Sequence, residues 1–180
     1  MTYFDVQTTY TREMIRDWGR LTWRELPMAR TLTWLIRALG GISLVLAALW
    51  LALLRQPGQA LVNAVSGAAL LLAAQCLPWL NGWLGWAVLP KGRTENRFLF
   101  GEEGVTNRDA AGTKTWPYGK MRLLLETPGG FCVVLSWSRY FPLEKSGFAA
   151  GDPAGFPGFL LGRCPKLKYK SFDIQIGGTT

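Results

Sequence analysis

The sequence predicts an α+β membrane protein with an N-terminal amphipathic helix, a two-helix transmembrane hairpin and a small antiparallel β-rich domain with one helix. Three observations predict this class: arginines at four-residue spacing near the N-terminus, two long uncharged apolar runs, and short apolar segments between glycine-rich turns. The expected segments are an amphipathic juxtamembrane segment at 1–31, the hairpin at 32–90 and the β-rich domain at 94–176.

The hairpin rests on two stretches without any charged residue. Ala38–Leu54 has 17 such residues and Gln56–Pro90 has 35. A bilayer core of about 30 Å requires roughly 20 apolar residues in a helix, so we expect spans at about 32–54 and 60–89. Two buried core helices of a soluble protein are the alternative, which the length of the runs disfavours. The first run also begins too far into the chain for a cleaved signal peptide.

The orientation follows from the basic residues near the spans. Pro57-Gly58 is a turn signal, and so short a link makes the spans an antiparallel hairpin. Six arginines precede the first span, three basic residues follow the second, and the turn has only Arg55. The positive-inside rule therefore predicts a multi-pass protein with both termini in the cytoplasm.

The segment before the hairpin has the pattern of an amphipathic helix. Four arginines recur every four residues on one side, and apolar residues at spacings of three and four form the other. The arginines are Arg12, Arg16, Arg20 and Arg24, and the apolar residues are Met14, Ile15, Trp18 and Leu21. Thr11 is the expected N-cap, and Pro27 ends or kinks the helix. Two interpretations stay open: arginines that contact anionic headgroups, or a helix packed on the domain with its arginines solvated.

Polar residues inside the spans are few and uncharged. Asn63, Ser66 and Gln75 are the candidate intramembrane polar residues, because polar groups in lipid are usually functional or adhesive. Small residues predict close packing of the two helices, which we favour over a conduction path. They are Gly40, Gly41, Ala60, Ala64 and Ala68. Pro78 predicts a bend, followed by an aromatic belt at Trp79, Trp83 and Trp86.

The last segment alternates short apolar runs with turns, which indicates an antiparallel meander. The expected strands are 97–100, 105–108, 113–116, 121–126, 131–137 and 139–143, with a further strand in the tail 166–176. Residues 154–163 are expected to form a helix capped by Asp152. Six aromatic residues are expected to build the core: Trp116, Phe131, Trp137, Phe141, Phe156 and Phe159.

The tail has a basic stripe, in which Lys166, Lys168 and Lys170 alternate with other residues. Residues 91–180 have 13 Lys+Arg against 8 Asp+Glu. The stripe is a candidate contact to anionic lipid, which is a nearer ligand than nucleic acid for a tethered domain. A basic edge strand that resists aggregation is the alternative.

The composition argues against catalysis. The chain has no His, which excludes His-containing zinc sites and the Ser-His-Asp and Cys-His catalytic sets. No Walker loop and no GxGxxG sequence is present. We therefore expect no enzyme activity, no catalytic or metal-binding residues and no cofactor.

Three motifs resemble the bacterial YcxB-like membrane protein family. They are Phe98–Val105, Trp116–Met121, and Tyr140–Leu143 with Phe148, within residues 95–162. The resemblance implies a pleckstrin-homology-like half barrel closed by a C-terminal helix and tethered to the bacterial inner membrane, with no catalytic residues to transfer. Two departures from the family pattern are Pro117 directly after the tryptophan, and Gly155, Pro157 and Gly158 in the final helix, which predict that this helix is short or broken.

Three functions of different classes fit these features. The first is a non-catalytic binding or regulatory protein, anchored in the membrane, whose β-rich domain contacts a protein partner at the cytoplasmic face. The second is an immunity- or inhibitor-type membrane protein that neutralises one specific partner. The third is a subunit of an oligomeric pore or transporter, which leaves homo-oligomer formation open. The first is the function we expect.

Overall fold

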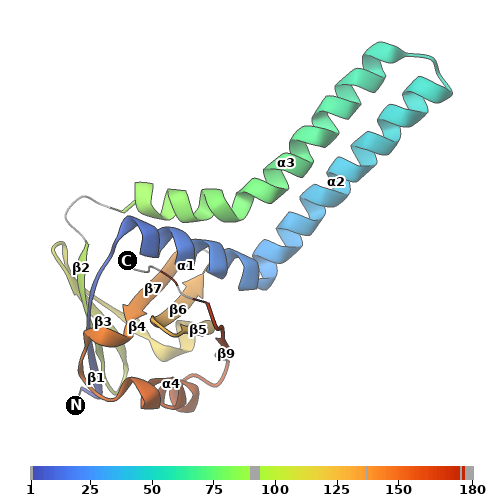
Figure 1. Ribbon diagram of the computed structural model, residues 1–180. Helices are drawn as coiled ribbons and strands as arrows, with labels where there is room; N and C mark the ends of the chain where they lie inside the picture. Colours follow the sequence, from blue (N-terminus) through green and yellow to red (C-terminus); the bar gives the residue numbers. More distant parts are fainter. Residues whose placement is uncertain (1, 90–93, 137, 175, 177–180) are drawn as a thin grey trace. The chain divides into compact units, whose positions relative to one another are not determined.

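The computed structural model describes residues 2–89, 94–136, 138–174 and 176 (Figure 1). The chain forms two compact units. One, called the β domain here, combines Met1–Thr22 with Gly82–Thr180, and the other, called the hairpin unit, is Trp23–Asn81. The hairpin unit is therefore inserted into the sequence of the β domain. This division differs from the predicted boundaries, since residues 1–22 belong to the β domain.

The β domain contains two sheets, which confirms the α+β class. The five-stranded sheet has the order β4-β3-β2-β1-β8 with antiparallel neighbours. Its strands are β4 (Gly112–Pro117), β3 (Gly104–Asp109), β2 (Glu95–Phe100), β1 (Phe4–Thr9) and β8 (Phe148–Ala150). The four-stranded sheet has the order β7-β6-β5-β9. Its strands are β7 (Arg139–Glu144), β6 (Gly130–Ser136), β5 (Leu123–Thr127) and β9 (Lys168–Ser171).

The predicted strands are found with small shifts of their ends, and two features differ from the prediction. β9 pairs with β5 in parallel, so the expected antiparallel arrangement is wrong at this edge. The physical reason is that the chain crosses over through β8 and α4 before it returns beside β5. β1 and β8 were not predicted at all, yet they pair with each other, and β1 also pairs with β2.

Aromatic side chains fill the core of the β domain. Phe156 is completely buried, and its ring centroid lies 5.3 Å from that of Phe4, 4.9 Å from Phe100 and 5.1 Å from Phe131. Phe156 begins α4 (Phe156–Arg163), a single continuous helix of 8 residues, as short as the glycines and proline in it predict. Of the other expected core residues, Phe131 and Phe141 are buried, Trp116 and Phe159 are half-buried, and Trp137 lies outside the described residues.

Three short 3₁₀ helices lie in the β domain: η1 (Tyr118–Lys120), η2 (Lys145–Gly147) and η3 (Pro153–Gly155). η3 precedes α4 directly. The side chain of Asp152 caps η3, because its Oδ1 accepts a hydrogen bond of 3.0 Å from the backbone N–H of Ala154. The predicted cap is therefore confirmed, one 3₁₀ turn ahead of the α-helix.

Helix α1 (Arg12–Glu25) begins as predicted. Thr11 Oγ1 accepts a hydrogen bond of 3.1 Å from the backbone N–H of Met14, which is the geometry of an N-cap. The apolar side of α1 is buried in the β domain, and the hydroxyl of Tyr140 donates to the backbone carbonyl of Ile15 at 3.1 Å. Two interpretations of this helix were left open, and the burial of its apolar side agrees with the one in which it packs on the domain.

The hairpin unit contains the two long apolar helices, α2 (Pro27–Ala52) and α3 (Pro57–Ala87). Pro27 occupies the first turn of α2, where its missing N–H is harmless, and Pro78 lies inside α3. A Cβ on Gly67 would lie 2.8 Å from the carbonyl oxygen of Gly40, so the two backbones touch there.

The contact surface between the helices is built from small residues at seven-residue spacing. Ala47 follows Gly40 by seven residues and is buried, as are Ala60 and Ala74, seven residues to either side of Gly67. This spacing is typical of antiparallel helices that pack side by side. The predicted packing through small residues is confirmed at Gly40 and Ala60. It does not extend to Ala68, which is exposed, or to Gly41, where a Cβ would meet nothing within 4 Å.

Candidate functional site

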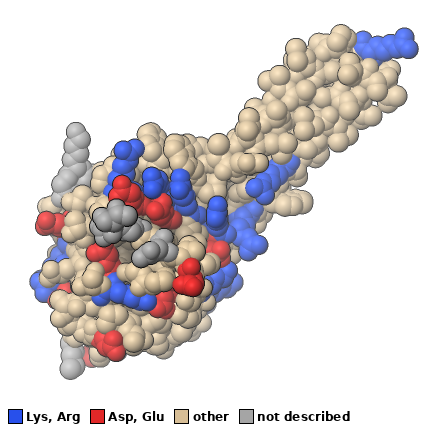
Figure 2. Space-filling model, viewed as in Figure 1, with Lys and Arg blue, Asp and Glu red and all other residues tan. Residues whose placement is uncertain are grey.

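The surface of the hairpin unit is apolar. Leu61, Leu72 and Val45 are 66%, 65% and 61% exposed, whereas the buried positions of α2 and α3 are glycines and alanines. Figure 2 shows the face toward the viewer without charge between the two ends of the hairpin. At 1.5 Å per residue the helices are about 39 and 46 Å long. Both are long and apolar enough to cross a membrane.

One end of the hairpin unit has a groove lined by cations. Arg24, Arg30 and Arg37 line it, together with Trp34 on α2 and Gln75 on α3, and its volume is about 510 Å³. The indole N–H of Trp23 donates to Thr33 Oγ1 at 3.2 Å, and Thr33 Oγ1 donates to the Ala29 carbonyl at 2.9 Å. These two bonds fix Trp23 against the start of α2. Sequence reasoning did not predict this groove, although the seven-residue spacing of Arg30 and Arg37 is visible in the sequence.

The four arginines predicted on one helix side belong to different units. Arg12, Arg16 and Arg20 are in the β domain, and Arg24 is in the hairpin unit. Asp17 Oδ1 lies 3.2 Å from Arg16 Nε and 3.6 Å from Arg20 Nη1, so part of this positive charge is neutralised locally. All four side chains are exposed or half-exposed, and their contact with headgroups stays a prediction.

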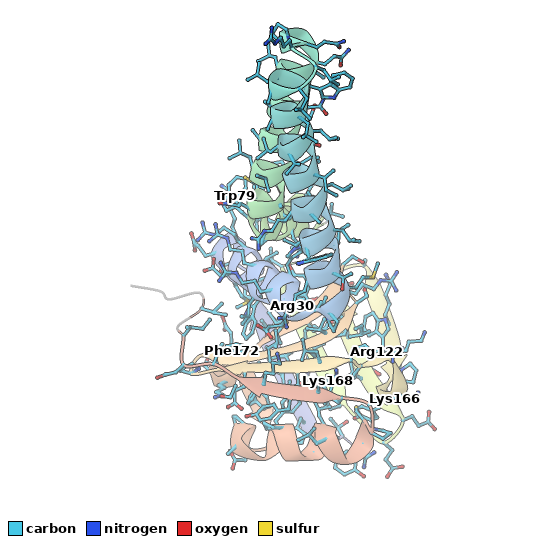
Figure 3. The ribbon with its side chains drawn as sticks, turned by 90° about the vertical axis from the view of Figure 1, so that its right-hand side faces the viewer. Arg30, Trp79, Arg122, Lys166, Lys168 and Phe172 are labelled. Atoms are coloured by element: carbon cyan, nitrogen blue, oxygen red, sulfur yellow. The ribbon has the colours of Figure 1, made fainter. Side chains whose placement is uncertain are left out.

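The predicted basic stripe lies on an edge strand. β9 pairs with β5 only, and its residues are exposed. The backbone N–H of Lys168 donates to the Arg122 carbonyl at 3.0 Å, which brings Arg122 beside the lysines (Figure 3). We call the resulting surface the basic edge, and its residues are Arg122, Lys166, Lys168 and Lys170. A charged edge strand of this kind also resists pairing with other chains.

Glu126 anchors the basic edge from the neighbouring strand. Its carboxylate accepts hydrogen bonds from Lys145 Nζ at 2.7 Å and from the hydroxyl of Tyr169. Burial alone would raise the pKa of Glu126, but the hydrogen bonds from Lys145 and Tyr169 and the charge of Lys145 outweigh it, so the pKa is lowered. Glu126 therefore stays ionised and holds Tyr169 in place.

The β domain also contains a polar pocket of about 480 Å³ that sequence reasoning missed. Asn107 Nδ2 donates to Asn96 Oδ1 at 3.0 Å, while the buried Asn107 Oδ1 has no hydrogen-bond partner among the described residues. Lys114, Trp116 and Arg139 also line the pocket. A buried acceptor without a donor is uncommon, and it makes this part of the β domain a candidate for recognition. We call this site the Asn107 pocket.

The three candidate intramembrane polar residues do not converge. Asn63 Nδ2 donates to the Gln59 carbonyl one turn earlier at 2.9 Å, which satisfies it within α3. Ser66 and Gln75 are exposed and nine residues apart, so they project from opposite sides of α3 at 100° per residue. One lumen lined by all three residues is therefore incompatible with this helix, and the pore or transporter function gains no support.

The two cysteines of the β domain are poor nucleophiles. Cys132 and Cys164 are buried, and burial raises the pKa of Cys164 to about 11 and that of Cys132 further still. Both thiols are protonated near neutral pH. Within the described part of the chain, no group of three or more Cys, Asp or Glu residues is placed to hold a metal ion.

Comparison of the chain with protein-family models, with curated proteins and with solved structures gives no match. The resemblance to the YcxB-like family therefore stays a prediction.

Proposed function

We propose that this protein is a non-catalytic binding protein, anchored by its hairpin in the bacterial inner membrane, whose β domain recognises a protein partner at the cytoplasmic face. The observation that carries the proposal is the apolar outer surface of α2 and α3 in a chain whose other unit has an ordinary buried core. Exposed leucines and valines over the length of a bilayer core are stable in lipid and unstable in water.

The pairing of β1 with β2 supports an even number of membrane crossings. Phe4 pairs with Phe100 and Thr9 with Glu95, and Asp5 forms an ion pair with Arg97 at 2.5 Å. Residues 4–9 and 95–100 must therefore lie on the same side of any membrane that the chain crosses between them. Two crossings by α2 and α3 satisfy this condition. The arginines at the end of the hairpin away from the turn support a cytoplasmic location of that side by the positive-inside rule.

Within the β domain, the Asn107 pocket is the proposed recognition site. It combines an unsatisfied buried acceptor, two rim cations at Lys114 and Arg139, and the half-buried ring of Trp116. The basic edge is the second surface on this domain that a partner could contact. The pleckstrin-homology-like fold is part of the same proposal, and two sheets with α4 packed into their aromatic core support it.

Anchoring is tested by alkaline carbonate extraction of membranes that contain the full chain. An integral protein stays in the pellet and dissolves only in detergent, whereas release by carbonate would overturn the proposal. The orientation is tested with an impermeant maleimide on intact cells. Because Cys132 and Cys164 are buried, only Cys76 needs replacement by serine. We expect Arg55→Cys to react in intact cells and Lys168→Cys to react only in opened ones, and the reverse pattern would contradict a cytoplasmic domain.

Recognition is tested by photo-crosslinking in cells, with benzoylphenylalanine at Arg139, at Lys168 or at the exposed Ala149. The proposal predicts one discrete adduct from Arg139 that Lys114→Glu abolishes, and none from Ala149. An adduct from Lys168 alone would assign recognition to the basic edge. Equal adducts at all three positions, or none, would contradict a binding module. If the adduct contains only one partner protein, the immunity- or inhibitor-type function, which requires one specific partner, would be tested next.

A further inference from the structure

The arginine-lined groove of the hairpin unit has the features of a lipid site. Arg30, Trp34 and Arg37 follow one another at four and three residues along α2, so they share one side of the helix. That side faces the groove, and Gln75 of α3 lines the opposite wall. We propose that this groove binds the phosphate of one anionic phospholipid, an inference that rests on the proposed membrane anchoring.

The charge of the groove requires an anion. Arg24, Arg30 and Arg37 line it, and Glu25 is the single acidic residue in the sequence from 23 to 81. The guanidinium group presents its N–H donors as a planar fork that matches two phosphate oxygens at once, and it stays charged at every physiological pH. The amide of Gln75 adds a neutral donor on the other wall. An anion with several oxygens fits this set of donors.

The position of the groove along the helices matches the height of lipid phosphates. When Arg55 lies at the surface on the turn side, the roughly 20 residues of a bilayer core reach back to about Trp34 on α2 and forward to about Trp79 on α3. These two tryptophans are 68% and 50% exposed, as expected for an aromatic belt. Arg30 lies one turn beyond that boundary, and Arg37 lies about one turn inside it, where a long side chain extends back toward the phosphates.

Figure 3 shows Arg30 and Trp79 at the same end of the hairpin, opposite its turn. Exposed apolar side chains continue from the groove toward the turn on both helices, with Val45 at 61% and Leu72 at 65%. A diacyl lipid with its phosphate in the groove would lay its acyl chains along these side chains. A free phosphate ion would use the cations but not the apolar surface, so the structure favours the lipid.

The probe is the full chain in nanodiscs made of equal parts phosphatidylcholine and phosphatidylglycerol. Native mass spectrometry of the released chain gives the ratio of the two lipids that stay bound. We expect phosphatidylglycerol to be retained preferentially at one molecule per chain. Arg30→Gln with Arg37→Gln should lower this preference roughly 25-fold, as the product of about fivefold for each arginine near an anionic surface.

Two control variants sharpen the result. Arg55→Gln with Arg108→Gln removes the same charge outside the groove and should leave the preference unchanged. Arg30→Lys with Arg37→Lys keeps the charge but loses the planar fork, and should give an intermediate preference. If the outside pair lowers the preference as much as the groove pair, or if the lysine variant equals the wild type, the lipid responds to general positive charge and the site is overturned.

Failure of this inference is distinguishable from failure of the proposed function. A chain that resists carbonate extraction but retains both lipids equally is anchored without a lipid site. A chain released by carbonate contradicts the anchoring itself. A final measurement adds inorganic phosphate to the nanodiscs. Release of the bound lipid at millimolar phosphate would show a phosphate site, whereas retention supports a site for the whole lipid.

Discussion

The β domain and the hairpin unit place the same kinds of residue in opposite positions. In the β domain, Phe98, Phe100 and Phe131 are completely buried. In the hairpin unit the large apolar side chains point outward, and Gly40 and Gly67 form the contact between the helices. In water the hydrophobic effect buries large apolar groups, but between helices in lipid it is absent and close backbone packing replaces it. The comparison teaches that the two units follow opposite packing rules, and this difference supports the proposed anchoring of the hairpin unit in lipid.

The largest expected effect comes from truncating one large apolar side chain in each unit and comparing the two losses of stability. Phe156→Ala removes a ring that packs against Phe4, Phe100, Phe131 and Phe148, and should destabilise the β domain by about 4 kcal/mol. Leu72→Ala, on the exposed side of α3, should change the stability of that domain by less than about 0.5 kcal/mol. Urea titrations in nanodiscs, read by the labelling of the buried Cys132, compare the two. Equal effects would contradict the inverted arrangement.

The next effect concerns the glycines of the hairpin. Gly67→Leu pushes a side chain into the Gly40 carbonyl and Leu44 and should cost about 1–3 kcal/mol of helix association. Gly41→Leu enters open space and is the matched control. Ala47→Cys with Ala60→Cys supplies a reporter, because a disulfide between these buried positions should form quickly in the control and slowly in the Gly67 variant. Rapid formation in both would show that this contact is not required.

A smaller effect lies at the junction of β1 and β2. Asp5 accepts hydrogen bonds from Arg97 Nε and Nη2, and this pair joins the strands on either side of the hairpin unit. Asp5→Asn should destabilise the β domain by about 1 kcal/mol, because charge-assisted pairs with two hydrogen bonds exceed ordinary exposed ones. Arg108→Gln on β3, an exposed arginine, is the control. A loss in the control as large as that for Asp5→Asn would contradict a specific role of the pair.

The smallest effect is a pH dependence at the basic edge. Because the folded pKa of Glu126 is lowered, its stabilising contribution is complete above the unfolded value near 4.5 and is lost as the pH falls through the folded value. Glu126→Gln should therefore destabilise the β domain by up to about 1 kcal/mol at pH 7 and by less in acid. Denaturant midpoints at neutral and acidic pH measure the difference. A penalty that grows in acid would contradict the assigned sign.

The sequence predicted those parts of the fold that local patterns determine. The two apolar helices, the Thr11 cap, the Asp152 cap and the strands from β2 to β7 follow from periodicity, turn residues and capping chemistry. β1 was not predicted because Gln7, Thr8 and Thr9 make the segment polar, and because the strands that bury it are distant in sequence. The parallel pairing of β9 is equally a tertiary property, set by the crossover and not by its residues.

The candidate site was predicted less completely. The basic stripe and the arginines were visible as charge patterns, but their distribution between two units was not. The Asn107 pocket depends on a diagonal contact between adjacent strands, because Asn107 pairs with Phe98 while Asn96 lies two residues earlier on β2. An isolated asparagine in a strand has no distinguishing signal. The arginine-lined groove required α3 to bring Gln75 beside α2, which only the antiparallel pairing of the helices provides.

The insertion of the hairpin unit between α1 and β2 has a consequence for biosynthesis. β1 leaves the ribosome first, but its partner β2 emerges only after both apolar helices have been made. β1 therefore stays unpaired until the hairpin unit has been synthesised. Once α2 and α3 have packed together, the loop that β1 and β2 must close is effectively shorter, and the entropic cost of closing it is lower. With the proposed anchoring, assembly of the five-stranded sheet would in this way report that both helices have been inserted.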